Sequence, residues 1–507
     1  MGMNTITALE MNALRIPNEE SLEFNGKIYT WKQLDEEANR YAKGLMDRGV
    51  RKGDHFAVYL RNSDHFVILS YAIWKIGAVL VPIHYRSALP EVVHILENAH
   101  IMGIICEEDY VDITQKANEQ LTKPLRLIVH RGDVEREHME PLKALRTDSI
   151  KANGTHLQAS DYAELLYTQG TTGHPKGALF THSQVMDGAV IYERISLMTR
   201  GDCYAVSVPL CHGLALNAIV LMAAVVGGKI CIQESFDADE ILMWMQQERV
   251  THFFGVPSMY VALTEKKTAD MQMQSMKVMC YGAAPMPIPL LEKMLDAFPT
   301  VKFFNAYGTT ESGPTGLVLL PSVQATKKGK TGKPMPLTAV RIVNDYMEEV
   351  APGERGEIMI KSPAMMTEYY NDPAATFTMM KNGWLFTGDL AVADEEGYIS
   401  IVGRKDNTII SGGETIHVVE IEQLLNEHPK VKDLVIMGVP DPLWGEMVVV
   451  TVVPVEGSHL TEEELIAYCK ERMASYKIPK RFVFIDELPR STSGKLLKDH
   501  LKERIMK

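Results

Sequence analysis

Short apolar runs alternate with longer helical patterns from about residue 55 onward, and this alternation constrains the fold more than any other feature of the chain. The runs have the length of single strands and lie at 55–60, 79–83, 102–106, 125–130 and 205–209. Strands that alternate with helices favour sheets flanked by helices, with ligands bound at the loops beyond the strand ends. We therefore expect a large N-terminal α/β domain.

The pattern changes toward the C-terminus, where the chain has further elements of its own. A helical pattern at 418–428 precedes strands and two more helices, and Thr461 and Glu464 have the spacing of a capping box at a helix start. The strand-like runs are 434–439, 448–453 and 482–485. Because 507 residues are too many for one hydrophobic core, we predict an N-terminal domain at 1–405 and a small α+β domain at 406–507, joined by a hinge.

A loop of glycines and threonines that ends in one lysine lies at 167–176, directly after the apolar run 163–166. Glycine lets backbone N–H groups converge on an anion, hydroxyls add donors, and the lysine supplies positive charge. The common phosphate loop is not matched, because Pro175 stands where its second glycine belongs. The loop is therefore a candidate phosphate site, and a solvated turn is the alternative.

Composition argues against several classes of function. The net charge is -13 and the basic residues are scattered, which argues against a nucleic-acid partner. Six cysteines without paired spacing indicate neither a disulfide framework nor a zinc site, and free thiols imply a reducing compartment. The longest apolar stretch, 218–226, is far shorter than the roughly 20 residues that span a bilayer. We expect a buried helix there, no transmembrane segment and a cytoplasmic location.

Three further motifs accompany the loop at 167–176: residues 307–311, Asp389 in Phe-Thr-Gly-Asp, and Lys495 in Ser-Thr-Ser-Gly-Lys. Each alone has a structural explanation, since Glu311 can cap a helix, Asp389 can open a turn and Lys495 can be a solvated lysine. Together, and in this order, they resemble the adenylate-forming superfamily of acyl-CoA synthetases, adenylation domains and luciferases. The resemblance extends over nearly the whole chain and continues in 282–285, 332–336, 356–358, 403–406 and 409–414.

The resemblance is greatest to ligases that join a fatty acid or a related carboxylate to coenzyme A, and it implies two half-reactions. A carboxylate and Mg-ATP give an acyl-adenylate and pyrophosphate, and the thiol of coenzyme A then displaces AMP. The first step brings two anions together and drives charge onto pyrophosphate, so the site must supply positive charge and donors. Lys176, Lys495 and Mg²⁺ can do this.

The resemblance assigns roles to residues along the ATP molecule. Residues 168–176 hold the β and γ phosphates, and the segments 282–285 and 305–307 flank the adenine. Asp389 binds the ribose, because its carboxylate can accept hydrogen bonds from two hydroxyls at once. The catalytic residues are Lys495, Glu311 and Thr310, and the metal-binding residues are Thr172 and Glu311. The ATP-binding residues are Thr168, Gln169, Gly170, Thr171, Thr172, Gly173, Lys176, Gly282, Ala283, Ala284, Asn305, Ala306, Tyr307, Gly308, Thr309, Thr310, Asp389, Arg404 and Lys495. Gln169 departs from the serine that is common in relatives, but its amide can still donate to phosphate.

The same resemblance implies an acyl pocket, a thiol path and a hinge. His212 lines the acyl channel, with a satisfied core histidine as the alternative, and the turn of the mobile C-terminal domain falls at Asp406. The acyl-pocket residues are His212, Phe254, Gly255, Gly282, Gly308 and Thr315. The candidates for coenzyme A are Ser411, Gly412, Gly413, Trp444 and Lys477, with packing as the alternative for Trp444.

The sequence favours an ATP-dependent acyl-CoA ligase acting on a medium- or long-chain fatty acid. Aryl or succinylbenzoate CoA ligation and transfer to a carrier protein remain as alternatives. A nucleotide-binding regulator without catalysis is disfavoured, because Lys495, Glu311, Asp389 and Arg404 are all present. The sequence does not indicate whether the protein is a monomer or an oligomer.

Overall fold

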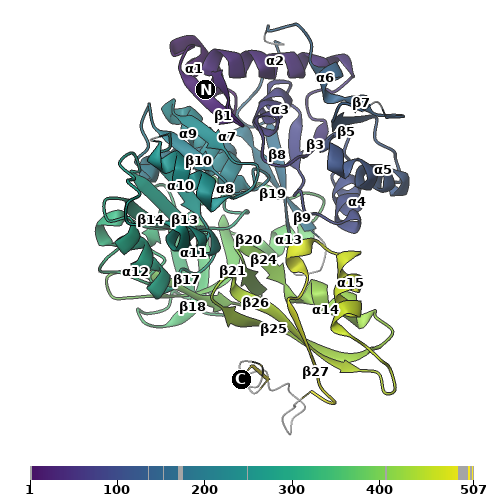
Figure 1. Ribbon diagram of the computed structural model, residues 1–507, viewed down its shortest axis with the longest axis vertical. Coiled ribbons are helices and arrows are strands. Elements are labelled where there is room, and N and C mark those ends of the chain that lie inside the picture. The colour runs from purple at the N-terminus through teal and green to yellow at the C-terminus, as the bar shows by residue number, and fades with distance from the viewer. Residues whose placement is uncertain are drawn as a thin grey trace.

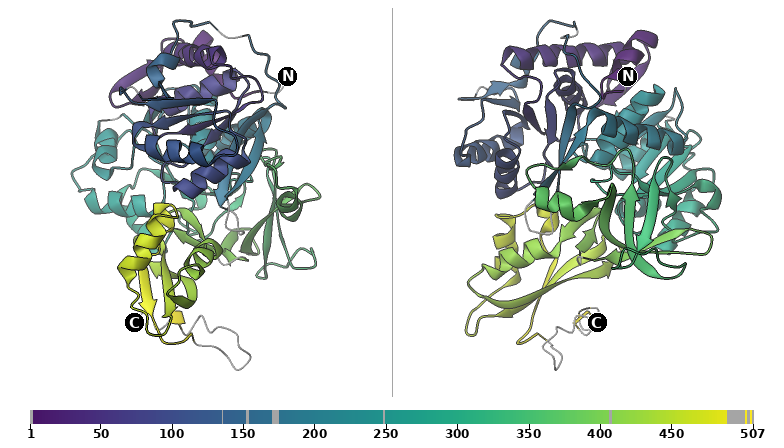
Figure 2. Two further views of the ribbon diagram at one scale, coloured as in Figure 1. Left: turned by 90° about the vertical axis from the view of Figure 1, so that its right-hand side faces the viewer. Right: turned by 180° about the vertical axis from the view of Figure 1, so that it is seen from behind.

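The computed structural model describes residues 3–134, 136–151, 154–169, 175–247, 249–405, 408–488, 501, 502 and 505. A large N-terminal domain with three sheets lies above a smaller C-terminal domain, which is drawn in yellow and light green in Figure 1. The two further views show the same division (Figure 2). The predicted combination of a large α/β domain and a small α+β domain is therefore confirmed.

The first large sheet has nine strands in the order β16-β15-β14-β13-β12-β10-β11-β1-β2, with a parallel centre from β14 to β1 and antiparallel pairs at both ends. Its strands are β1 (Glu20–Phe24), β2 (Lys27–Thr30), β10 (Cys203–Val206), β11 (Lys229–Ile232), β12 (His252–Gly255), β13 (Val278–Gly282), β14 (Lys302–Gly308), β15 (Gly316–Leu319) and β16 (Lys333–Pro334). The helices that precede or connect them are α1 (Thr7–Arg15), α7 (His182–Ser196), α8 (Gly213–Ala215), the π-helix η2 (Leu216–Leu221), α9 (Met222–Val226), α10 (Ala238–Gln246), α11 (Pro257–Lys266) and α12 (Ile288–Ala297).

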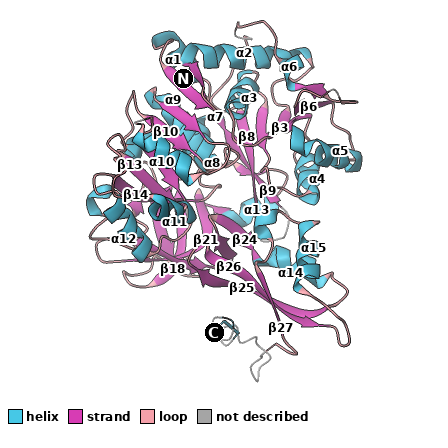
Figure 3. Ribbon diagram, viewed as in Figure 1, coloured by secondary structure: helices cyan, strands magenta, loops and turns pink. Residues whose placement is uncertain are grey.

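The second large sheet has eight strands in the order β19-β9-β8-β4-β3-β5-β6-β7. Its strands are β3 (His55–Tyr59), β4 (Val79–Pro82), β5 (Gly103–Glu107), β6 (Leu127–Arg131), β7 (Glu140–Pro141), β8 (Tyr162–Gln169), β9 (Pro175–Thr181) and β19 (Glu368–Tyr369). The helices along this part of the chain are α2 (Trp31–Asp47), α3 (Asp64–Lys75), α4 (Leu89–Asn98), η1 (Glu108–Tyr110), α5 (Val111–Gln120) and α6 (Leu142–Leu145). Each of the five apolar runs expected as strands overlaps a strand of these two sheets (Figure 3).

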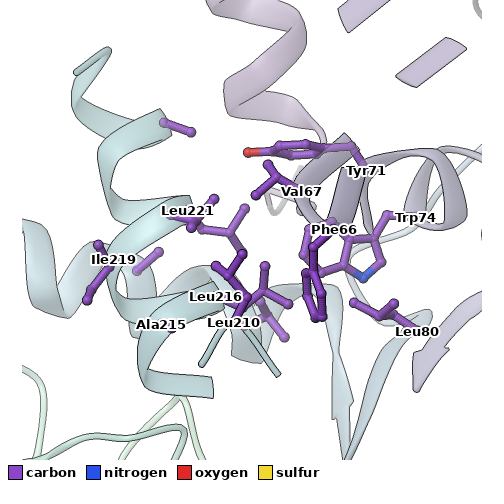
Figure 4. Packing of buried hydrophobic residues seen from close by; sticks show 14 of the residues in the cluster. Phe66, Val67, Tyr71, Trp74, Leu80, Leu210, Ala215, Leu216, Ile219 and Leu221 are labelled. Atoms are coloured by element: carbon purple, nitrogen blue, oxygen red, sulfur yellow. The ribbon is translucent and has the colours of Figure 1, made fainter. Parts of the chain in front are cut away.

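The two large sheets share a core in which α3 packs against the segment that follows β10 (Figure 4). Phe66 and Trp74 of α3 lie opposite Leu210 and Leu216, and the Trp74 indole donates to the Ala163 carbonyl at 2.9 Å. The predicted helix at 218–226 is buried as expected, but it begins as the π-helix η2 and continues as α9. Among the described residues, none of the helices combines the length and apolarity that crossing a membrane requires.

A third, antiparallel sheet completes the N-terminal domain and was not expected from the alternating pattern. Its order is β17-β18-β21-β20, with β22 paired to β21. Its strands are β17 (Ala339–Val343), β18 (Arg355–Lys361), β20 (Met380–Lys381), β21 (Trp384–Ala393) and β22 (Ile399–Arg404). Helix α13 (Pro373–Met379) precedes β20, whereas the 3-10 helix η3 (Pro321–Val323) lies between β15 and β16 of the first large sheet. The register of β21 and β22 places Asp389 directly opposite Arg404.

The C-terminal domain has its own sheet, in the order β24-β23-β26-β25, with β27 paired to β26. Its elements are β23 (Thr408–Ser411), β24 (Glu414–His417), α14 (Val418–Asn426), β25 (Val431–Asp441), β26 (Gly445–Pro454), α15 (Glu462–Lys470), η4 (Ser475–Lys477) and β27 (Arg481–Phe484). Of the expected capping box, only half is present: Thr461 accepts from the Glu464 amide at 3.2 Å. The Glu464 carboxylate instead accepts from Lys430 at 2.9 Å, a charged partner that competes for it.

Candidate active site

Glu311 lies in the loop after β14 of the first large sheet and accepts hydrogen bonds from two strands of the second large sheet. The Thr168 hydroxyl at the end of β8 donates to Oε1 of Glu311 at 3.2 Å, and the Tyr369 hydroxyl of β19 donates to the same oxygen at 2.7 Å. The Lys176 ammonium lies 5.6 Å from the centre of the Tyr369 ring. Carboxylate and hydroxyl oxygens are the ligands that Mg²⁺ prefers, so Glu311 and Thr168 fit the predicted metal. Sequence reasoning assigned no role to Tyr369.

Several predicted residues lie outside the described part of the chain, including the catalytic lysine. They are Gly170, Thr171, Thr172, Gly173, Asp406 and Lys495. Gln169 is described by its backbone, which pairs with Pro175 between β8 and β9.

Asp389 forms a second polar cluster with Tyr307 and Arg404. The Tyr307 hydroxyl donates to Oδ2 of Asp389 at 2.6 Å, and Nη1 of Arg404 lies 3.0 Å from Oδ1. Burial raises the pKa of Asp389, although Arg404 and the Tyr307 hydrogen bond oppose the rise. Within the described chain, Nε of Arg404 is buried and makes no hydrogen bond. A ribose or phosphate oxygen is a suitable partner for this donor.

The two segments predicted to flank adenine lie at the ends of neighbouring strands. β13 and β14 are parallel, with Gly282 opposite Ala306. A Cβ at Gly282 would lie 2.2 Å from the Ala306 carbonyl oxygen, so this approach requires glycine. Ala283, the next residue, has φ of +62°, in the left-handed region that side chains with a Cβ disfavour. Such strain is concentrated at ligand sites.

The loop after β14 folds back on the strand and carries the remaining predicted ATP residues. A Cβ at Gly308 would lie 2.3 Å from the Pro314 carbonyl oxygen. The Thr309 amide donates to the Ser312 hydroxyl at 2.9 Å, and the Thr310 carbonyl accepts from the Gly313 amide at 3.0 Å. These contacts fix the turn that presents Glu311.

His212 is not packed as a core histidine, because 44% of its side chain is exposed. It is the N-cap residue of α8, and desolvation of its ring by the surrounding protein lowers the ring's pKa, whereas Glu414 opposes the change. The other predicted acyl-pocket residues are more enclosed. Phe254 is 2% exposed, and the fully buried Thr315 donates to the Ser312 carbonyl and contacts the Ser362 hydroxyl at 2.8 Å.

Glu414 reaches His212 from the C-terminal domain. Its Oε2 lies 3.9 Å from Nε2 of His212, while Oε1 accepts from Arg86 at 2.6 Å and lies 3.5 Å from Nε2 of His84. Burial alone would raise the pKa of Glu414, but His84, His212 and Arg86 outweigh it and lower the pKa to about 2. Sequence reasoning assigned no role to His84, Arg86 or Glu414, although Glu414 closes the recognised motif 409–414.

One group of nitrogen and sulfur donors lies beside this contact. His84, Cys211 and His212 each place one ligand atom within 4.8 Å of the others. Imidazole and thiol donors suit zinc and not Mg²⁺. The Mg²⁺ expected from the sequence therefore fits Glu311 and Thr168 and does not fit this group.

The predicted thiol-step loop is a tight hairpin turn between β23 and β24. Gly412 and Gly413 have φ of +60° and +84°, as a two-residue turn of this kind requires. A Cβ at Gly413 would lie 2.7 Å from Val256 of the N-terminal domain, and one at Gly412 would lie 2.7 Å from the Trp444 ring. The turn therefore touches both domains, and Ser411, which precedes it, is 6% exposed.

Trp444 and Lys477, the two other candidates for coenzyme A, differ in their surroundings. Trp444 is 38% exposed, packs on Gly412 and lies under the Lys480 ammonium at 5.3 Å. Lys477 is fully buried and forms ion pairs with Glu91 and Glu420. In this arrangement its ammonium is engaged by carboxylates and is not presented to a ligand from solvent.

Known proteins resemble the chain over both domains. Residues 9–370 match the AMP-binding enzyme family, and residues 420–495 match the AMP-binding enzyme C-terminal domain. A feruloyl-CoA synthase of Amycolatopsis sp is 34% identical over 496 residues, with 96% of each chain covered. The long-chain-fatty-acid–CoA ligase FadD13 of Mycobacterium tuberculosis is 32% identical over 477 residues, covering 94% of this chain and 93% of the relative.

Solved structures of one relative differ in their likeness to the chain. The o-succinylbenzoate CoA synthetase MenE of Bacillus subtilis is 29% identical. A double mutant of it bound to the product analogue OSB-NCoA gives a TM-score of 0.88, with 99% of both chains covered. MenE in complex with ATP and magnesium gives 0.73, with 99% of this chain and 100% of that chain covered. The backbone is thus closer to the product-analogue complex.

Proposed function

Because the chain belongs to the AMP-binding enzyme family and is an AMP-forming acid–thiol ligase, we propose that it joins a hydrophobic carboxylic acid to coenzyme A in two steps at one site. In the first step the carboxylate attacks the α-phosphorus of ATP, which forms the acyl-adenylate and releases pyrophosphate. In the second step the thiol of coenzyme A attacks the acyl carbonyl, and AMP leaves.

The residues around Glu311 and Asp389 carry the first step. Asp389 accepts hydrogen bonds from the ribose hydroxyls, and Arg404 donates hydrogen bonds to ribose and phosphate oxygens. Lys176 and Lys495 balance the charge that develops on the phosphates. Glu311 and Thr168 would hold Mg²⁺, which neutralises phosphate charge when bound. The geometry of Tyr307, Asp389 and Arg404 supports this assignment, since it leaves one buried Arg404 donor for the nucleotide.

The second step is assigned to the domain arrangement in the present structure. The Gly412–Gly413 turn packs against Val256, and Glu414 meets His212 at the proposed acyl channel. The single observation that carries the assignment is the likeness to MenE with its product analogue, which exceeds the likeness to MenE with ATP. Lys495 must reach the same carbonyl in the first step, so we propose that the C-terminal domain, 406–507, turns at Asp406 between steps.

Two classes of acid are proposed as substrates. The first is a medium- or long-chain fatty acid, as expected from the sequence and supported by FadD13. The second is an aryl acid of the feruloyl or succinylbenzoate type, supported by the feruloyl-CoA synthases and 2-succinylbenzoate–CoA ligases among the relatives. The reaction is assigned to the cytoplasm, since all six cysteines are free.

Acid-dependent exchange of labelled pyrophosphate into ATP tests the proposal. Ferulate, 2-succinylbenzoate, octanoate and palmitate form the panel, and mass spectrometry then detects the coenzyme A thioester of each active acid. Exchange and thioester with the same acid support the proposal. Exchange without thioester favours transfer to a carrier protein, and exchange with none of the acids contradicts both substrate classes.

A further inference from the structure

The segment 84–91, which runs from the loop after β4 into the first turn of α4, is the place where the C-terminal domain docks on the N-terminal domain through charged groups. Lys477 contacts the Glu91 carboxylate, and Arg86 contacts Glu414 at 2.6 Å. The ring of Tyr476 lies 5.6 Å from that of His84, and its centre lies 5.2 Å from the Arg86 guanidinium. Neighbouring residues of η4 thus meet both ends of the segment.

Lys477 is the most enclosed charge in this contact. Its side chain is 1% exposed, and those of Glu91 and Glu420 are 10% and 16% exposed. A buried ammonium is tolerated only when carboxylates and hydrogen bonds compensate for its lost hydration. Here one carboxylate comes from each domain, because Glu420 lies in α14 beside Lys477 and Glu91 lies in α4.

Glu91 is also held by a hydrogen bond within its own domain. Its Oε2 accepts the Ala88 amide at 2.8 Å at the start of α4, while Oε1 contacts Lys477. If the C-terminal domain turns away, Lys477 keeps Glu420 and loses Glu91. The Glu91 contact therefore distinguishes one domain arrangement from another, and the Glu420 contact does not.

We propose that Glu91 and Lys477 form an interdomain latch that favours the thioester-forming arrangement, in which the Gly412–Gly413 turn reaches the acyl site. Both are positioning residues, since they act through the domain orientation and not on the reacting atoms. The inference rests on the proposed function, because the two half-reactions must need different arrangements for such a latch to affect catalysis.

Glu91→Gln tests the latch, because glutamine keeps an oxygen for the Ala88 amide and removes the charge that faces Lys477. Stopped-flow assays with synthetic feruloyl- and dodecanoyl-adenylate measure thioester formation, and pyrophosphate exchange measures the first step. We expect thioester formation to fall at least tenfold while exchange stays the same or rises. Glu97→Gln is the matched control, since Glu97 lies in the same helix and contacts Thr122 of its own domain.

Hydrogen–deuterium exchange of the ligand-free full-length protein supplies a readout that does not depend on activity. We expect peptides covering 84–91 and 411–414 to exchange faster in Glu91→Gln than in the parent and in Glu97→Gln. Glu420→Gln, which leaves the Glu91 contact in place, should change the balance of the half-reactions less than Glu91→Gln does.

The outcomes separate the latch from the ligase proposal. If the parent forms no thioester from either adenylate, the ligase proposal fails for these acids, and the deuterium exchange alone decides whether the latch exists. If the parent is active and Glu91→Gln matches it in both half-reactions and in exchange, the latch is wrong. Equal loss of both half-reactions also overturns it, because that result indicates general damage.

Discussion

The Tyr307 hydroxyl donates a hydrogen bond to Oδ2 of Asp389 across 2.6 Å and so joins the first large sheet to the small antiparallel sheet. Arg404 holds the other oxygen of the same carboxylate. Tyr307 and Arg404 together fix the carboxylate that we propose binds the ribose hydroxyls. Both also lower the pKa of Asp389 and so oppose the rise that burial causes.

Tyr307→Phe should therefore weaken the use of ATP. A hydrogen bond to a charged group contributes roughly 1.5–3 kcal/mol, so we expect the KM for ATP in pyrophosphate exchange to rise about tenfold or more. Loss of the donor also raises the pKa of Asp389 further, so activity at low pH should be lost at a higher pH than in the parent. Tyr346→Phe is the control, since Tyr346 is 84% exposed. An unchanged KM and an unchanged acid limb would rule out this role.

Gly413→Ala should impair the thiol step selectively. The added Cβ meets Val256 at 2.7 Å, and φ of +84° adds strain of about 1–3 kcal/mol. We expect thioester formation from preformed adenylate to fall by at least tenfold while pyrophosphate exchange is retained. Gly457→Ala has a similar φ of +77° and no neighbour within 4 Å, so it measures the strain alone. Equal behaviour of the two variants would argue against the contact with Val256.

Stability should fall as the pH drops below 6.5, and His182 should contribute to the loss. Burial lowers the pKa of His182 from 6.5 to about 4, so its ring is neutral in the folded protein while the unfolded chain binds a proton below 6.5. Folding stability is thus independent of this group above pH 6.5 and is lost from there down to pH 4, by up to about 3 kcal/mol.

The variant His182→Asn isolates that contribution. Asparagine places an amide near the position of Nδ1, which contacts the Thr5 hydroxyl at 2.9 Å, and it does not titrate. Urea unfolding at pH 7, 6 and 5 should show a shallower loss of stability in the variant than in the parent. Parallel pH profiles would show that His182 is not the group that takes up the proton.

Lys495→Ala should abolish adenylate formation far more than it weakens ATP binding, because the lysine is expected to act where charge develops. Loss of one such donor lowers the rate on the order of 10²–10³-fold. Pyrophosphate exchange measures the rate, and equilibrium dialysis with ATP measures binding. Exchange near the parent's rate would remove Lys495 from the mechanism and favour the regulator alternative.

Five strands of the two large sheets, β3, β4, β5, β6 and β10, were predictable because each overlaps an apolar run that lies between helical patterns, as at 79–83 and β4. Among the described residues, the strands of the small antiparallel sheet are separated by one short helix, α13, instead of a regular series of helices, so the alternation gave no sign of this sheet. The clusters at Glu311 and Asp389 contain predicted residues that motifs mark locally. Tyr369 was missed because its place depends on the pairing of Tyr369 with Ala178, far away in the sequence.

The contacts between the domains could not be predicted from the sequence. Arg86 and Glu414 are 328 positions apart, and they meet only because the C-terminal domain adopts one particular orientation. Local patterns define each domain's own core, as in the buried faces of α14 and α15. Contacts between the two domains, such as that of Glu91 with Lys477, join residues far apart in the sequence and carry no periodic signal. The hinge at Asp406 stays a prediction.

Quantification of all products of one complete reaction tests the two-step ligase mechanism most directly. The purified protein is incubated with Mg-ATP, coenzyme A and the acid that gives the highest exchange, and AMP, pyrophosphate and thioester are measured together. The mechanism predicts that the three form in equal amounts, and that omission of the acid abolishes all of them. Formation of ADP and phosphate, or thioester without AMP, would contradict it.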